Sequence, residues 1–165
     1  ESDGISVYSN VSGDNLKTIF ENFLAQANPG ESKSAGRSYV ALQAYVQPNS
    51  ETDKALEDLR LKIRNSQKLA TTVGYGPRFL HSTGQLHKGN AGHGLFIQIT
   101  SEASEDAPIP DKAGADTSSM SFDVLKMAQA LGDRQALLDA GRNVIRFHLG
   151  TDVIRGLQQL QKALA

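Results

Sequence analysis

Residues 39–74 read YVALQAYVQPNSETDKALEDLRLKIRNSQKLATTVG, and this stretch predicts the architecture of the whole chain. It begins with Tyr39–Val46, an apolar run of strand length, and ends with a second β-prone run, Leu69–Gly74. Between them lies an amphipathic helix that Ser50 or Thr52 can cap. Two apolar strands joined by a helix predict a β–α–β unit, in which the strands are parallel and the crossover is right-handed.

The alternation of strands and helices continues on both sides of this unit. Further strands are predicted at Ile5–Ser9, Leu95–Thr100 and Asn143–Leu149. Further helices are predicted from Asn15 onward, over Phe122–Leu131 and Arg134–Ala140 with a break at Gly132-Asp133, and over Thr151–Leu164. We therefore expect an α/β fold with three αβα layers, built on a doubly wound, five-stranded parallel sheet. Ligands of such sheets bind at the carboxyl ends of the strands. The irregular segment Ser101–Met120 is long enough to form a lid or a packing arm.

The composition favours a soluble cytoplasmic domain. The 165 residues suffice for a single domain, residues 1–165, and they include no Cys, which fits a reducing compartment. A net charge of −1 argues against nucleic acid as a partner, and no apolar run has the length of a membrane span. Because the chain begins at Glu1 and not at a Met, we expect a fragment of a larger protein.

Acidic residues are absent from a long central stretch. Residues 59–101 contain no Asp or Glu but carry six Lys and Arg residues and three His residues. One interpretation is a chance distribution on a solvated surface. The other is a site kept free of carboxylates so that it can bind an anion such as a phosphate.

The segment GYGPRFLHSTGQLHKG, residues 74–89, concentrates polar chemistry directly after a predicted strand. His81 can exchange a proton near neutral pH, and Arg78 and Lys88 can contact a phosphate. Ser82 or Thr83 can cap a short helix whose backbone N–H groups also suit an anion. Each of these residues also has a purely structural interpretation, as a cap, a core histidine or a solvated charge.

Neither a metal nor an organic cofactor is predicted. His81, His87 and His93 are spaced by six residues, which does not align them on one helix face, and no Cys or acidic residue lies nearby to complete a site. The dinucleotide fingerprint and the Walker loop are absent from the sequence.

Several separated motifs resemble one enzyme family. The run at 74–89, together with GLFIQIT (94–100), SFDVLKMAQALGDRQALLDAGR (121–142) and NVIRFHLG (143–150), resembles the C-terminal part of bifunctional transaldolase/phosphoglucose isomerase proteins. The run LHSTGQ (80–85) is also similar to the Leu-His-Ser-Met-Gly-Gln run of bacterial phosphoglucose isomerases. The resemblance extends from about Tyr39 to the C-terminus. It implies a single sugar-isomerase (SIS) domain of flavodoxin-like topology that interconverts glucose 6-phosphate and fructose 6-phosphate through an enediol, without metal or organic cofactor.

The resemblance also implies roles for individual residues. His81 falls on the family's histidine, which assists ring opening and reaches into the active site of a neighbouring subunit. We therefore expect a homo-oligomer or other domains of the same chain as partners, with no nucleic acid and no membrane. Substrate contacts are expected from residues that surround or follow His81 in the motif: Arg78, Ser82, Thr83, Gln85, His87 and Lys88.

Three functional elements of the family are harder to place. Lys162, the lysine of the last helix, is the first candidate for the catalytic lysine, with Lys88 and Lys126 as alternatives. The family's base is a Glu, and Glu31 in Pro-Gly-Glu-Ser resembles its motif, but a helix and a strand separate Glu31 from His81. The phosphate-binding Ser/Thr loop belongs to the family's other SIS domain, so we expect the isolated chain to be inactive.

Two other functions compete with the isomerase. A non-catalytic SIS module that binds or senses phosphorylated sugars would use the same fold, and a Glu within reach of the sugar discriminates the two. A transaldolase requires a complete (β/α)₈ barrel, which 165 residues cannot form. Transaldolase activity is therefore expected only from further sequence preceding Glu1.

Overall fold

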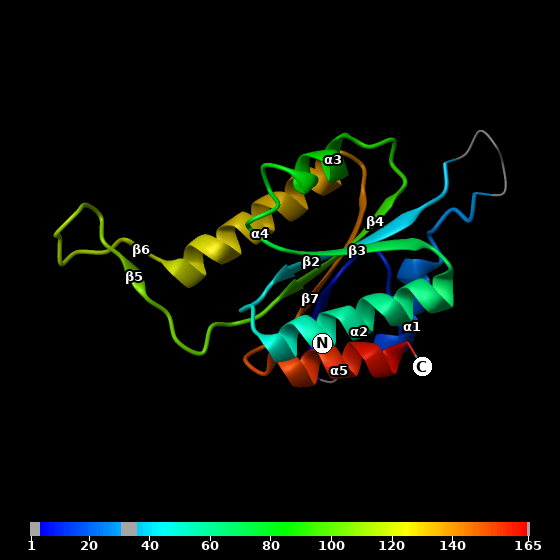
Figure 1. Ribbon diagram of the computed structural model, residues 1–165, viewed down its shortest axis with the longest axis horizontal. Coiled ribbons are helices and arrows are strands. Elements are labelled where there is room, and N and C mark those ends of the chain that lie inside the picture. Colours follow the sequence, from blue (N-terminus) through cyan, green and yellow to red (C-terminus); the bar gives the residue numbers. More distant parts are fainter. Residues whose placement is uncertain (1–3, 31–35, 165) are drawn as a thin grey trace.

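The computed structural model describes residues 4–30 and 36–164, arranged around a five-stranded sheet (Figure 1). The strands follow the order β1-β7-β4-β2-β3 and comprise β1 Ser6–Tyr8, β7 Asn143–His148, β4 Gly94–Thr100, β2 Tyr39–Tyr45 and β3 Ala70–Tyr75. The helices are α1 Leu16–Leu24, α2 Ser50–Gln67, α3 Thr83–Gly89, α4 Phe122–Asp139 and α5 Val153–Ala163. A separate two-stranded ribbon consists of β5 Pro108–Ile109 and β6 Met120–Ser121.

The topology confirms the doubly wound α/β prediction, with one correction. Strands β3, β2, β4 and β7 are parallel, and if β2 is taken as the first strand their order is the flavodoxin-like 2-1-3-4. The fifth strand, β1, was expected to be parallel but pairs antiparallel with β7, so that Ser6 faces His148. No β–α–β crossover joins these two strands, so the handedness rule does not set the direction of β1. A single antiparallel edge strand is common on such sheets.

The helices cover both faces of the sheet, and the two faces differ in chemistry. In Figure 1, α1, α2 and α5 lie on one side of the sheet and α3 and α4 on the other. The first side buries the main apolar core, in which Phe20 and Phe23 of α1 and Leu59 of α2 are fully buried. Packing of this kind supplies most of the stability of a domain, at roughly 25 cal/mol per Å² of buried apolar surface.

The face under α3 and α4 is more polar. Successive strand residues point to opposite faces, so Gln43 of β2, Gln98 of β4 and Arg146 of β7 all lie on this side. All three are buried. Gln98 Nε2 donates to the carbonyl oxygen of Ala130 at 2.9 Å, which ties α4 to the sheet.

Two local predictions need correction. The side chain of Asn49, and not that of Ser50 or Thr52, caps α2 by accepting a hydrogen bond from the backbone N–H of Thr52 at 2.8 Å. The expected break at Gly132-Asp133 is absent, and α4 runs continuously through it. Asp133 faces the interior, where its carboxylate contacts Lys88 and the Tyr45 hydroxyl. A helix also tolerates an internal Gly such as Gly132, at a cost of about 1 kcal/mol.

The segment Ser101–Met120, which was predicted to be irregular, contains the short strand β5 and meets β6 at its end. In Figure 1 the β5–β6 ribbon projects from the body beside the start of α4. Hydrogen bonds within the segment hold its shape, since Asp111 accepts from the backbone and hydroxyl of Ser119 at 2.8 and 2.6 Å. Across residues 4–30 and 36–164, no helix combines the length and apolar character needed to cross a bilayer.

Candidate functional site

A cavity of about 320 Å³ lies at the carboxyl edge of the sheet. The chain leaves β2 toward α2 on one face and leaves β4 toward α4 on the other, so the ends of these adjacent strands diverge. This is the switch point at which doubly wound sheets bind ligands. The lining comes from the segments that follow four parallel strands, together with one α4 side chain: residues 46–48, 75–78, 101–105, 151, 153 and Lys126.

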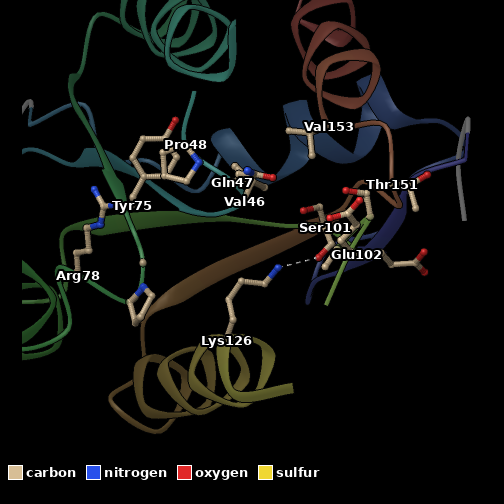
Figure 2. A pocket seen from close by; sticks show the side chains of 15 residues that line it. Val46, Gln47, Pro48, Tyr75, Arg78, Ser101, Glu102, Lys126, Thr151 and Val153 are labelled. Atoms are coloured by element: carbon tan, nitrogen blue, oxygen red, sulfur yellow. Dashed lines mark hydrogen bonds between the residues drawn. The ribbon is translucent and has the colours of Figure 1, made fainter. Parts of the chain in front are cut away.

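Two cationic side chains line different walls of this cavity. Figure 2 shows Arg78 on the loop after β3 and Lys126 reaching in from α4. Lys126 Nζ donates to the carbonyl oxygen of Ser101 at 3.4 Å and pairs with Asp123 Oδ1 at 2.6 Å. Arg78 is exposed, and its charge opposes the increase in the pKa of Tyr75 that burial and the Tyr75–Asp53 hydrogen bond produce. The cavity therefore offers both an ammonium held by two contacts and an exposed guanidinium to an anion.

Carboxylates and hydroxyls complete the lining. Glu102 and Glu105 come from the segment after β4, as do the hydroxyls of Ser101 and Ser104. The backbone of Glu102 is fixed because its N–H donates to the carbonyl of Gly150 at 3.0 Å. The side chain of Glu102 is 63% exposed and remains accessible to a ligand.

The imidazole of His148 lies near the Glu102 carboxylate. His148 Nε2, at the end of β7, lies 3.9 Å from Glu102 Oε1, and its Nδ1 lies 3.0 Å from the hydroxyl of Thr100. Thr100 and His148 are aligned partners in the parallel register of β4 and β7. The sheet thus positions the ring that faces the carboxylate.

The loop that carries Arg78 packs closely on a buried aromatic ring. A Cβ atom at Gly76 would overlap the ring of Tyr45, so only glycine permits this approach. The Gly76 N–H donates to the carbonyl of Ala44 at 2.9 Å, which continues the hydrogen bonding between β2 and β3. The prediction that residues 74–89 leave the sheet at its carboxyl edge is confirmed.

Most of the polar residues predicted in this segment lie outside the cavity. His81, Ser82 and Gln85 are exposed around the start of α3. Ser82 Oγ donates to the carbonyl of Phe79 at 3.3 Å, and Gln85 Nε2 donates to the carbonyl of Leu80 at 2.7 Å. Ser82 and Gln85 therefore stabilise their own turn in this chain, whereas His81 remains accessible on the surface.

Thr83 and His87 face a different space. They line a small cavity of about 70 Å³ between α3 and the sheet, together with Gln43. His87 is 7% exposed, and its Nδ1 lies 3.3 Å from Gln43 Nε2. Burial lowers the pKa of His87 from its usual range, while the nearby Asp133 charge opposes that change.

Lys88 is engaged in an internal ion pair. Its Nζ lies 2.8 Å from Oδ1 of Asp133 on α4, at an angle that does not meet the geometry of a regular hydrogen bond. The Asp133 side chain is 1% exposed, and its other oxygen accepts from the Tyr45 hydroxyl at 3.4 Å. Burial and the Asp133 carboxylate raise the pKa of Tyr45. Through Lys88, Asp133 and Tyr45, these contacts link α3, α4 and the end of β2.

The structure separates the candidate lysines. Lys162 lies near the C-terminal end of α5, beside a depression shared with Asn15 and Leu16 at the start of α1. Because α5 follows β7, its last turn lies toward the amino end of the sheet, away from the cavity. Lys126, an alternative candidate, lines the cavity itself, and Glu31 lies outside the described residues.

Sequence reasoning did not identify Glu102, Glu105 and Asp133. Glu102 follows the predicted strand GLFIQIT by only two residues, so its place at the carboxyl edge was a signal present in the sequence. No pattern in the sequence indicated that Asp133 pairs with Lys88. In the part of the chain that the structure describes, no three His, Asp or Glu side chains gather as a metal site would require.

The comparisons with known proteins support the fold. No protein-family model and no curated protein matches the chain. Among solved structures, the crystal structure of a hypothetical protein from Thermus thermophilus matches with a TM-score of 0.57 and 19% identity. The match covers 76% of this chain and 34% of that one, so the chain spans about a third of its structural neighbour. A likeness at this identity concerns the architecture alone.

Proposed function

We propose that this chain is a sugar-isomerase domain that interconverts glucose 6-phosphate and fructose 6-phosphate, and that the carboxyl-edge cavity binds the phosphorylated sugar. The observation that carries the proposal is that Arg78, Lys126 and Glu102 line one cavity at the switch point of the sheet. Phosphate recognition needs cationic donors, and aldose–ketose isomerisation needs a group that moves a proton. The cavity contains both.

The chemistry follows from these side chains. Lys126 and Arg78 bind the phosphate dianion, and the hydroxyls of Ser101 and Ser104 donate to sugar oxygens. The Glu102 carboxylate takes the proton from C2 of the open-chain aldose, which leaves an enediolate with its charge on O1. The proton of the O2 hydroxyl moves to O1, and Glu102 returns its proton to C1, which leaves the C2 carbonyl of the ketose. His148 Nε2 lies 3.9 Å from the Glu102 carboxylate, beyond hydrogen-bond distance but near enough to influence its charge.

Other parts of the active site are proposed to come from outside this chain. His81 is exposed and is the residue that the resemblance assigns to ring opening in a neighbouring subunit. We therefore propose a homo-oligomer or further domains, including a transaldolase, in a longer protein. We also propose the cytoplasm as its compartment, because the sequence has no Cys, as suits a reducing environment.

The same position of His81 favours a second candidate function. Because His81 is not among the residues that line the cavity, a non-catalytic module that binds phosphorylated sugars would need only Arg78, Lys126 and the hydroxyls. The two candidates differ at Glu102. If the isomerase proposal holds, Glu102→Gln lowers turnover of the longer protein by roughly 10²–10⁴. A binding module has no turnover to lose.

Calorimetric titration with glucose 6-phosphate tests the cavity in the chain itself. Lys126→Met should weaken binding about 10- to 100-fold, the usual effect of removing a charged hydrogen-bond partner. Lys54→Met is the matched control, because Lys54 pairs with Asp58 on the exposed side of α2. Equal affinity for wild type and Lys126→Met would contradict the assignment of this cavity.

A further inference from the structure

A row of side chains crosses the sheet on the face that α4 covers. In register across β2, β4, β7 and β1 lie Gln43, Gln98, Arg146 and Tyr8. Figure 1 shows α4 on this side of β4 and β7. Arg146 carries the charge of the row and is only 9% exposed.

The guanidinium of Arg146 makes two weak contacts and lies over an aromatic ring. Nη1 lies 3.5 Å from Thr100 Oγ1 and 3.9 Å from the sulfur of Met127, and the guanidinium carbon lies 3.8 Å from the centre of the Tyr8 ring. Nε is buried, and none of the described residues provides an acceptor for it. Among residues 4–30 and 36–164, no Asp or Glu lies within ion-pair distance of Arg146. Burial accordingly lowers its pKa.

A second arginine intensifies the positive charge. Arg134 of α4 is half-buried and close enough for its charge to lower the pKa of Arg146 further. Its Nε is also buried without an acceptor, and none of the described carboxylates forms an ion pair with it. A buried charge without a counterion is strongly destabilising. Among the described residues Arg146 is such a charge, and the half-buried Arg134 adds to the positive potential around it, which favours an anion.

We propose that Arg146 and Arg134, with Tyr8 at the edge of the sheet, form a second oxyanion-binding site that takes a phosphate group. Guanidinium groups bind the oxygens of phosphate through paired N–H donors, which suits two arginines better than a single ammonium would. Arg134 lies eight residues after Lys126 on α4, about 12 Å along the helix at 1.5 Å per residue. Neither arginine nor Tyr8 lines the carboxyl-edge cavity, so the proposed site does not depend on the proposed isomerase function.

Arginine side-chain NMR tests this site with inorganic phosphate as the probe. The ¹⁵N-labelled Arg78→Met/Lys126→Met protein, in which the carboxyl-edge cavity lacks its cations, is titrated at constant ionic strength against chloride. The Nε–Hε signals of Arg146 and Arg134 should shift and saturate. Arg146→Met and Arg134→Met, each added to this protein, should weaken phosphate binding about 10- to 100-fold. Arg155→Met is the matched control, because Arg155 is exposed on α5.

Three results would overturn the proposal. The first is that phosphate produces no more change than chloride, and the second is that the saturable shift survives in Arg146→Met and Arg134→Met. The third is that these variants lose self-association in sedimentation while phosphate has no effect, which would identify a carboxylate of a second copy as the counterion. Arg134→Met keeps the test valid if Arg146→Met does not fold, because Arg134 is only half-buried. Failure of glucose 6-phosphate to bind the carboxyl-edge cavity would not affect this result.

Discussion

Replacing Lys88 by Met should destabilise the fold and not merely weaken a ligand contact. The Lys88 ammonium lies 2.8 Å from a carboxylate oxygen of Asp133, whose side chain is 1% exposed. Without Lys88, that buried carboxylate keeps, among the described side chains, the Tyr45 hydroxyl at 3.4 Å. An interior carboxylate with one weak donor is poorly compensated for its lost hydration.

The magnitude follows from the burial of the pair. Removing one partner of a buried ion pair costs about 3–5 kcal/mol, and the lower end applies because the Lys88 side chain is 24% exposed. In a domain of this size each kcal/mol lowers the melting temperature by about 2–4 °C, so we expect a decrease of about 6–12 °C. Lys88→Met/Asp133→Leu should recover most of that loss, because neither charge then remains buried.

Urea unfolding followed by circular dichroism at pH 7 measures the effect. Lys54→Met, which breaks the exposed Lys54–Asp58 pair, should change the free energy of unfolding by less than about 0.5 kcal/mol. The reasoning is refuted if Lys88→Met unfolds at the wild-type midpoint. If that variant also loses glucose 6-phosphate binding, Lys88 is a substrate contact, as the sequence alone suggested.

Three further predictions concern the segment after β3. His81→Asn should leave the free energy of unfolding within about 0.5 kcal/mol of the wild-type value, because His81 is exposed. The same change should lower turnover of the longer protein by a factor of roughly 10²–10⁴, and unchanged turnover would show that His81 does not act in ring opening. Burial lowers the pKa of His87, so the unfolded chain takes up the proton first and stability should decrease as the pH falls below 6.5; a wild-type pH profile in His87→Leu would contradict this. Gly76→Ala should lower the free energy of unfolding by about 1–3 kcal/mol and weaken glucose 6-phosphate binding, because its Cβ would overlap the Tyr45 ring and displace the Arg78 loop. The control is Gly89→Ala, whose Cβ has open space around it, and equal effects of the two changes would argue against a steric cause.

Much of the fold could be read from the order of residues because strand and helix formation depends on local periodicity. The five apolar runs became the five strands of the sheet, and helices cover both of its faces as expected. The carboxyl-edge position of the 74–89 segment also followed, because a segment that leaves a parallel strand must begin at that edge. These properties depend on neighbours within about a dozen residues.

Three outcomes depended on contacts between distant parts of the chain. The direction of β1 is set by its pairing with β7, from Ser6 to His148, across nearly the whole sequence. The composition of the cavity is set by the meeting of the loop after β3 with the start of α4, which brings in Lys126 and leaves Lys162 at the other end of the domain.

The side chains of the 74–89 segment show the same division most clearly. Local chemistry determined that this segment is cationic and leaves the sheet at the carboxyl edge. Only packing determined that Arg78 lines the cavity, that His87 is buried against Gln43, and that Lys88 pairs with Asp133. The physical reason is that the role of a polar side chain depends on which charges and dipoles surround it, and those come from elements far away in the sequence.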